Sequence, residues 1–161
     1  KFKEICKILD INNLNDLNKK ELRFYLHSYQ SYLFNKAVSI YLKKYKNYKE
    51  VEYSLGEFTF SKRSEKLKFP LVSFDFKSGK KDKIYLEILK DEGIKLDQFI
   101  IREYPWLIEE TTYRDVFIKV KNFKTLKYIK DDLNPGKFKQ IIKFSLPKGS
   151  YATILVKQMF D

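Results

Sequence analysis

The sequence predicts an α+β fold of mixed helices and short strands. One long segment repeats apolar residues at three- and four-residue steps, as an amphipathic helix does, and several short segments alternate apolar and polar residues, as strands do. These segments show neither regular strand–helix–strand alternation nor an internal repeat, which argues against a parallel βαβ sheet. Hydrophobic residues make up 43% of the 161 residues, so a packed core can form.

The first half of the chain is expected to contain one long helix and three strands. Residues 1–20 form a lead-in segment broken by turn-forming Asn and Asp residues. Asn18 stands three residues before Glu21, which is typical of a capping box and predicts a helix over about 20–45. Its apolar stripe comprises Leu22, Leu26, Tyr29, Leu33, Ala37 and Ile40. Strands are expected at 51–53, 57–60 and 72–76, with a charged loop at 62–68.

The second half is expected to contain two further helices and two strands. Asp82 can cap a helix that runs to Glu92 and ends at Gly93. Asp97 opens a shorter helical turn that stops before Pro105. The remaining expected elements are a strand at 114–120, a turn at 134–136, a strand at 139–146 and a final helix at 151–160 capped by Ser150.

The net charge of +12 suggests an anionic partner, of which nucleic acid is the commonest. Lysine-rich surfaces also arise from biased coding or adaptation to heat, so charge alone does not distinguish nucleic-acid binding from these origins. The single cysteine, Cys6, fits a reducing cytoplasm, and with the single histidine, His27, it does not make a metal site. No apolar run approaches the roughly 20 residues that span a bilayer, and the first residues show no signal-peptide pattern.

Two segments carry more than a generic pattern. Residues 23–35 read RFYLHSYQSYLFN, and residues 144–153 read FSLPKGSYAT. Both resemble signature stretches of the TruD family of tRNA pseudouridine synthases, in the same order, and the second is close to the family's strand–LPxGSYAT–helix motif. Weaker similarities lie at Phe69-Pro70-Leu71, Glu87, Gly93-Ile94, Phe99 and Thr112-Tyr113-Arg114. The sequence departs from the family at Lys157-Gln158, where Arg-Glu is common, and it lacks the Gly residues expected after Leu71 and before Arg114.

The resemblance implies a TRUD-like insertion domain at 21–138 and a return into the pseudouridine synthase catalytic domain at 139–161. It also implies tRNA as the partner, the uridine at position 13 as the target, a cytoplasmic location, and neither cofactor nor metal. The family's catalytic Asp and its Asn-x-Phe-Gly motif lie N-terminal to the 23–35 stretch, and nothing before residue 20 matches them. We therefore expect the catalytic carboxylate in a missing N-terminal half, which is also a candidate partner.

The candidate site residues form two groups. By analogy, the active-site wall consists of Phe144, Leu146, Pro147, Gly149 and Ser150, because glycine permits close backbone approach and a helix N-terminus suits an anion. A plain strand-to-helix turn explains these residues about as well. The expected RNA contacts are Arg114, Lys148, Gln30, Asn35 and Arg23.

Each RNA contact has a structural alternative. Arg114 matches a family arginine and can grip phosphate, but it can equally pair with Asp115 or Glu110. Gln30 and Asn35 are amides that need partners if buried, and Asn35 can also bond within its own helix. The leading function is therefore part of a tRNA pseudouridine synthase. The alternatives are a non-catalytic basic RNA-binding module or split-enzyme subunit, and a structural interaction protein whose charge keeps it in solution.

Overall fold

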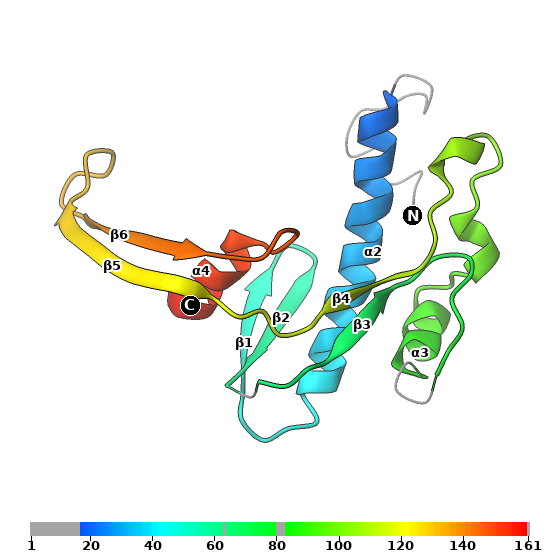
Figure 1. Cartoon of the computed structure of the whole chain (residues 1–161), viewed down its shortest axis with the longest axis horizontal. Coiled ribbons are helices and arrows are strands. Elements are labelled where there is room, and N and C mark those ends of the chain that lie inside the picture. The colour runs from blue at the N-terminus through cyan, green and yellow to red at the C-terminus, as the bar shows by residue number, and fades with distance from the viewer. Residues whose placement is uncertain (1–16, 63, 80–82, 161) are drawn as a thin grey trace. The chain divides into compact units, whose positions relative to one another are not determined.

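The computed structural model describes residues 17–62, 64–79 and 83–160, which form two compact units. Unit 1 contains the described residues up to 62 and from 68 to 114, and unit 2 contains 64–67 and 115–160. The elements in chain order are α2 (Lys19–Leu42), β1 (Tyr48–Tyr53), β2 (Gly56–Ser61), β3 (Lys68–Leu71), α3 (Lys83–Asp91), two 3-10 helices (Leu96–Phe99 and Pro105–Leu107), β4 (Thr112–Asp115), β5 (Lys121–Lys130), β6 (Phe138–Ser145) and α4 (Ala152–Phe160) (Figure 1). The strands form three two-stranded sheets, β1–β2, β3–β4 and β5–β6, and the predicted α+β class is confirmed.

Helix α2 of unit 1 begins with the predicted capping box. The Asn18 side chain accepts hydrogen bonds from the backbone N–H groups of Lys20 at 2.9 Å and Glu21 at 3.1 Å. The Glu21 carboxylate in turn accepts the Asn18 backbone N–H at 2.9 Å, so three backbone donors at the helix start are satisfied. Leu33 and Ala37 of the predicted stripe are fully buried, so this stripe faces the core of unit 1.

The core of unit 1 is centred on Tyr85 of α3. Its ring meets Phe69 of β3 edge-on at 6.0 Å and lies 5.7 Å from Phe76, and the residue is 0% exposed. Its hydroxyl donates to the Pro70 carbonyl at 2.8 Å, which satisfies the one polar atom that this ring brings into the core. Tyr85 therefore ties α3 to β3 through both packing and a hydrogen bond.

Most predicted element positions agree with the structure. The strands predicted at 51–53 and 57–60 form the antiparallel hairpin β1–β2, which turns at Gly56. Helix α3 ends at Asp91, and Gly93 follows it with a φ of +65°, which allows the Ile94 N–H to donate to the Leu89 carbonyl at 2.9 Å. The predicted cap at Asp82 lies outside the described residues.

Two predicted strands are wrong. The first was predicted at 72–76, but the strand there is β3, which ends at Leu71. The segment 72–76 is a turn in which the Phe76 N–H donates to the Ser73 carbonyl at 3.2 Å. Val72 and Phe76 are both buried, so their spacing reflects anchoring of a turn and not a pleated strand. The strand predicted at 114–120 ends at Asp115, and no strand was predicted over β5.

Unit 2 consists of the β5–β6 hairpin and helix α4. The strands are antiparallel, and the register contains two irregularities, one between Lys121 and Lys124 and one between Thr125 and Tyr128. In each, three residues of β5 span the distance of two on β6, which is the count of a β-bulge. Asn122, in the first bulge, has a φ of +53°, a left-handed conformation that asparagine tolerates.

Unit 2 has almost no hydrophobic core of its own. Every residue of β5 is exposed, and α4 has no buried residue. Among the described residues of this unit, Leu67 is the one buried hydrophobic side chain. Its apolar side chains are therefore largely exposed to solvent. A lone two-stranded hairpin is at best marginally stable in water.

Candidate functional site

The exposed start of α2 carries an ionic cluster around Glu109. The Arg23 Nε lies 3.0 Å from one Glu109 carboxylate oxygen, and the His27 Nε2 contacts the other. The carboxylate is 30% exposed, whereas Arg23 and His27 are about half exposed. Arg23, predicted as an RNA contact, thus lies on the surface with its guanidinium directed to a carboxylate.

The two candidate amides of α2 have different environments. Gln30 is 3% exposed, and its Nε2 donates to the Val72 carbonyl at 3.1 Å. The partner that sequence reasoning required for a buried amide is therefore the backbone of the turn after β3. Asn35 is half-buried. Of the two, only Asn35 presents part of its surface to solvent.

Arg114 is held against α2 within unit 1. Its guanidinium donates to the Ser31 hydroxyl at 3.3 Å and lies 5.3 Å from the centre of the Phe34 ring, a cation–π arrangement. Both contacts join β4 to the middle of α2. The sequence did not predict the contact between Arg114 and the Phe34 ring, because the distance along the chain between β4 and α2 gives no sign of it.

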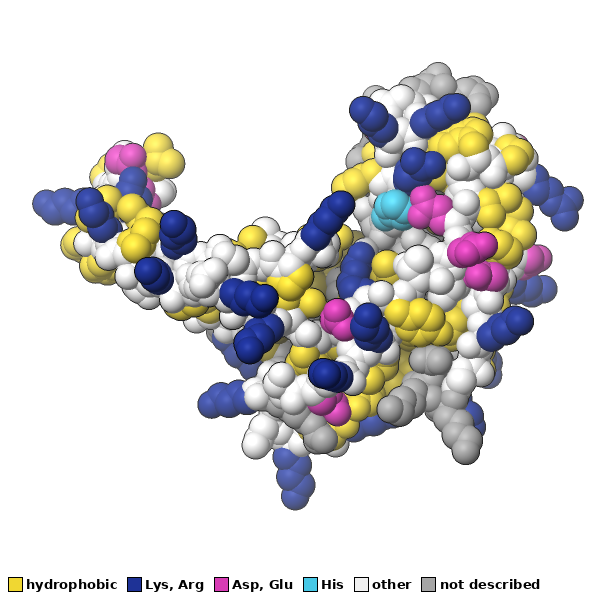
Figure 2. Space-filling view, viewed as in Figure 1, with side chains coloured by type: hydrophobic (Ala, Val, Ile, Leu, Met, Phe, Trp, Pro, Cys, Tyr) yellow, Lys and Arg dark blue, Asp and Glu magenta, His cyan; other side chains and the backbone are white. Residues whose placement is uncertain are grey.

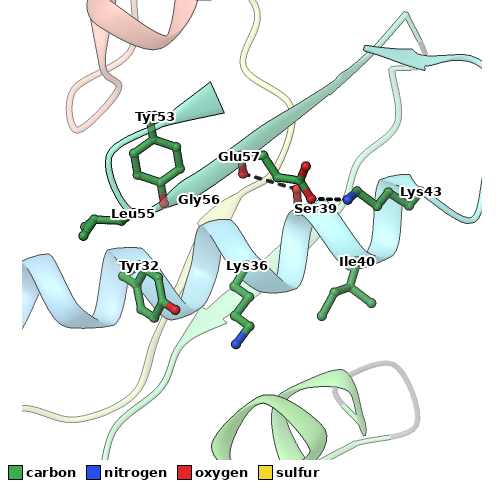
Figure 3. A pocket seen from close by; sticks show the side chains of 9 residues that line it. All are labelled: Tyr32, Lys36, Ser39, Ile40, Lys43, Tyr53, Leu55, Gly56 and Glu57. Atoms are coloured by element: carbon green, nitrogen blue, oxygen red, sulfur yellow. Dashed lines mark hydrogen bonds and ion pairs between the residues drawn. The ribbon is translucent and has the colours of Figure 1, made fainter. Parts of the chain in front are cut away.

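A shallow cavity of about 220 Å³ lies between α2 and the β1–β2 hairpin. Figure 3 shows Lys36 and Lys43 extending from α2, with Tyr53, Leu55 and Glu57 on the hairpin side. The Lys43 ammonium contacts the carboxylates of Glu50 and Glu57, and its hydrogen bond lowers the pKa of Glu57. Its positive charge is therefore already balanced, and the cavity offers an anion little.

The second cation of this cavity is balanced by a nearly buried carboxylate. Glu92, whose side chain is 7% exposed, accepts hydrogen bonds from the Lys36 ammonium and the Tyr32 hydroxyl, both at 2.9 Å. Beside it, Tyr29 stacks on Tyr32, and burial raises the pKa of Tyr29. The Tyr29 hydroxyl is buried without a hydrogen-bond partner among the described residues. Sequence reasoning placed Glu92 only at a helix end and missed this network.

The five wall candidates all lie in unit 2, at the junction of β6 and α4. Phe144 and Leu146 are half-buried, Pro147 is exposed, and Ser150 N–H donates to the Pro147 carbonyl at 3.2 Å to close a turn. Gly149 has a φ of +84°, and a Cβ built on it would meet nothing within 4 Å. The turn therefore requires glycine for its backbone conformation and leaves open space beside it.

The same turn presents Lys148 to solvent. Among the described residues, no cluster of His, Cys, Asp or Glu could hold a metal ion, and no helix combines the length and apolar character needed to cross a bilayer.

The arrangement defines a basic α+β protein with one well-packed unit and one hairpin–helix unit that lacks its own core. Residues 59–159 match the family model described as tRNA pseudouridine synthase D (TruD). The chain belongs to this family.

Similar proteins agree with this assignment. The chain is 33% identical to the "Probable tRNA pseudouridine synthase D 2" of Methanocaldococcus jannaschii over 98% of its length, but covers 40% of that protein. It is 35% identical to the "Probable tRNA pseudouridine synthase D 1" of Methanococcus maripaludis over 99% of its length, and covers 42% of it. The crystal structure of a TruD protein from Methanosarcina mazei aligns with a TM-score of 0.59 and 27% identity, over 89% of this chain and 39% of that one.

Proposed function

We propose that this chain is the C-terminal part of an enzyme that isomerises uridine to pseudouridine in tRNA, at position 13. The observation that supports the proposal most directly is the extent of the alignments. Almost the whole of this chain aligns with two curated relatives, but it covers only 40% and 42% of their lengths. The proposed reaction breaks the N1–C1′ bond of the uridine and rejoins the rotated uracil through C5. An Asp carboxylate does the covalent or acid–base work, and it belongs to polypeptide outside this chain.

The role proposed for residues 139–161 is to complete the catalytic domain, with 21–138 as the TRUD-like insertion. In this assignment Phe144, Leu146, Pro147, Gly149 and Ser150 line the uridine pocket. The target base must leave its stack to react, and it then needs a close, dry wall. The open space beside Gly149 and the exposed turn of which it is part support this role.

The exposed apolar side chains of α4 support a missing polypeptide partner. Val156 and Met159 are each 40% exposed and Phe160 is 61% exposed, which is unusual for a helix that packs on its own domain. The occupant proposed for this surface is an N-terminal polypeptide from the part of the relatives' length that this chain does not cover, and the assembly would act in the cytoplasm. It would bury the apolar face and supply the catalytic Asp at once.

The proposed tRNA contacts are Arg23, Asn35, Arg114 and Lys148. Arg23 and Lys148 are exposed, and Asn35 is partly so, whereas Gln30 is enclosed by the core and is left out of the contact set. Arg114 would contribute by holding β4 against α2, or by turning outward to phosphate when tRNA binds. A non-catalytic RNA-binding subunit of a split enzyme would have the same contacts.

Reconstitution tests the proposal. Unmodified tRNA is incubated with the chain alone, with an N-terminal segment of the Methanocaldococcus jannaschii relative alone, and with both, and pseudouridine is mapped along the tRNA. We expect product at one position only when both polypeptides are present. Product from residues 1–161 alone would refute the claim that the carboxylate lies elsewhere. tRNA binding without product in any mixture would favour a binding subunit.

A further inference from the structure

The β5–β6 hairpin has one face on which lysines gather. In an antiparallel pair, directly opposed residues point to the same side, and residues alternate along each strand. The register opposes Lys121 to Ser145, Lys124 to Lys143 and Ile129 to Lys139. One face therefore carries four lysines, Lys121, Lys124, Lys139 and Lys143, which we call the lysine face.

The first bulge of β5 creates this face. Lysines recur at every third position of the strand, and in a regular strand Lys121 and Lys124 would point to opposite sides. The extra residue between them, at the position of Asn122, returns Lys124 to the side of Lys121. The bulge thus places the charges of Lys121 and Lys124 on one face, whereas a regular strand would place them on opposite faces.

Nothing on the two strands balances this charge. Neither β5 nor β6 contains an Asp or Glu, and Lys124 and Lys143 stand directly opposite each other. Like charges in that arrangement repel and destabilise the pair. Lys139 contacts Asp132 of the hairpin loop, whereas Lys121, Lys124 and Lys143 are exposed along the strands. Figure 2 shows dark blue lysine side chains extending from the hairpin.

We propose that the lysine face binds the phosphate backbone of tRNA. Lys139 and Lys143 are four residues apart, or about 13 Å along the strand, which is longer than a single phosphate group and suits an extended polyanion. The opposed Lys124–Lys143 pair would exchange mutual repulsion for attraction when a phosphate lies between the two ammonium groups. The inference rests on the proposed function for the choice of tRNA as the polyanion.

The other face of the hairpin has a different character. It carries Tyr128 and Phe138, whose rings stack at 5.1 Å, together with Ile142 and Phe144 on β6, and its one lysine among the paired residues, Lys130, stands opposite Phe138 at the loop end. This apolar face is available to the polypeptide partner, and Phe144 belongs to the proposed uridine wall. The hairpin would then hold the RNA backbone on one side and help to complete the catalytic domain on the other.

Salt-dependent tRNA binding tests the lysine face. Dissociation constants of the whole chain for an unmodified tRNA transcript are measured over a range of salt concentrations, for the wild type and for the double variant K124Q/K143Q. The control K46Q/K90Q makes the same charge change at exposed positions of unit 1. The double variant K124R/K143R keeps the charge, and circular dichroism checks that each variant folds.

The expected result is specific to the lysine face. Loss of two phosphate contacts should lower the slope of log K against log salt by about 1.5 and weaken binding about tenfold or more near 0.1 M salt. The control and the arginine variant should remain close to wild type. Wild-type affinity and slope in K124Q/K143Q, or an equal loss in the control, would overturn the lysine face and leave the proposed function standing. If the wild type binds no tRNA at low salt, both fail.

Discussion

Replacing Gln30 separates a structural role from an RNA-reading role for the one candidate amide that is fully enclosed. Its Nε2 donates to the Val72 carbonyl at 3.1 Å, and the residue is 3% exposed. Methionine has nearly the same shape but cannot donate, so Gln30→Met leaves a buried carbonyl without its donor. That loss should destabilise unit 1 by about 1–3 kcal/mol, the usual penalty for an unsatisfied buried polar group. Gln30→Ala adds a cavity and should cost more.

Urea unfolding followed by Trp106 fluorescence measures this loss, because the single tryptophan lies in unit 1. With a slope of roughly 2 kcal/mol/M, a loss of about 2 kcal/mol lowers the midpoint by about 1 M. The control is Gln98→Met, an exposed amide of the same unit whose Oε1 accepts the Lys95 N–H, where water can replace it. tRNA affinity of the folded Gln30→Met chain should equal that of the wild type. Unchanged stability with weakened tRNA binding would refute the reasoning.

Three further predictions concern the turn after β6, a surface carboxylate and helix α4. Gly149→Ala forces a Cβ into a φ of +84° and should cost about 1–2 kcal/mol, seen as faster amide hydrogen exchange at 150–154. Hydrogen bonds from the Thr111 side chain and backbone hold the pKa of Asp75 below 3.8, so its stabilisation is complete above that value and is lost as the pH falls through the lowered pKa. Asp75→Asn should therefore reduce the fall in the free energy of unfolding of unit 1 as the pH is lowered into the acid range. An unchanged fall would contradict this. Met159→Lys should leave the stability of the isolated chain within about 0.5 kcal/mol but prevent co-purification with the N-terminal polypeptide.

The sequence predicted elements whose signals are local. The capping box at Asn18 and the glycine stop at Gly93 depend on neighbouring residues only, and both are present. The strand predicted at 72–76 was wrong because a buried turn can show the same alternation of apolar residues as a strand. Val72 and Phe76 are both buried there. There, the contacts that decided the backbone, such as the Ser73 N–H with the Thr111 hydroxyl at 3.1 Å, join residues far apart in the sequence.

The candidate residues show the same limit. Gln30 and Arg114 are polar residues whose partners, Val72 and Phe34, lie on other elements, and no spacing along the chain reveals them. β5 was missed for a related reason. Its lysines recur with a period of three, which hides the period of two on which a strand is recognised. The first bulge places Lys121 and Lys124 on one face of the hairpin despite that spacing.

The bulges also connect the two proposals. A hairpin with regular alternation would mix the lysines of β5 with the aromatic rings on both faces, and neither face would suit one kind of partner. With the observed register, Lys124 and Lys143 share one face, while Tyr128, Phe138 and Phe144 share the other. A polyanion and an apolar polypeptide surface can then bind the same hairpin at the same time. Deleting Asn122 would remove the first bulge but leave Lys121 two positions from Lys124, so regular alternation would keep both lysines on the same face of the hairpin. tRNA binding and the apolar side chains around Tyr128 and Phe138 should then both stay close to wild type, and a marked loss of tRNA binding in this folded variant would argue against this division of the hairpin.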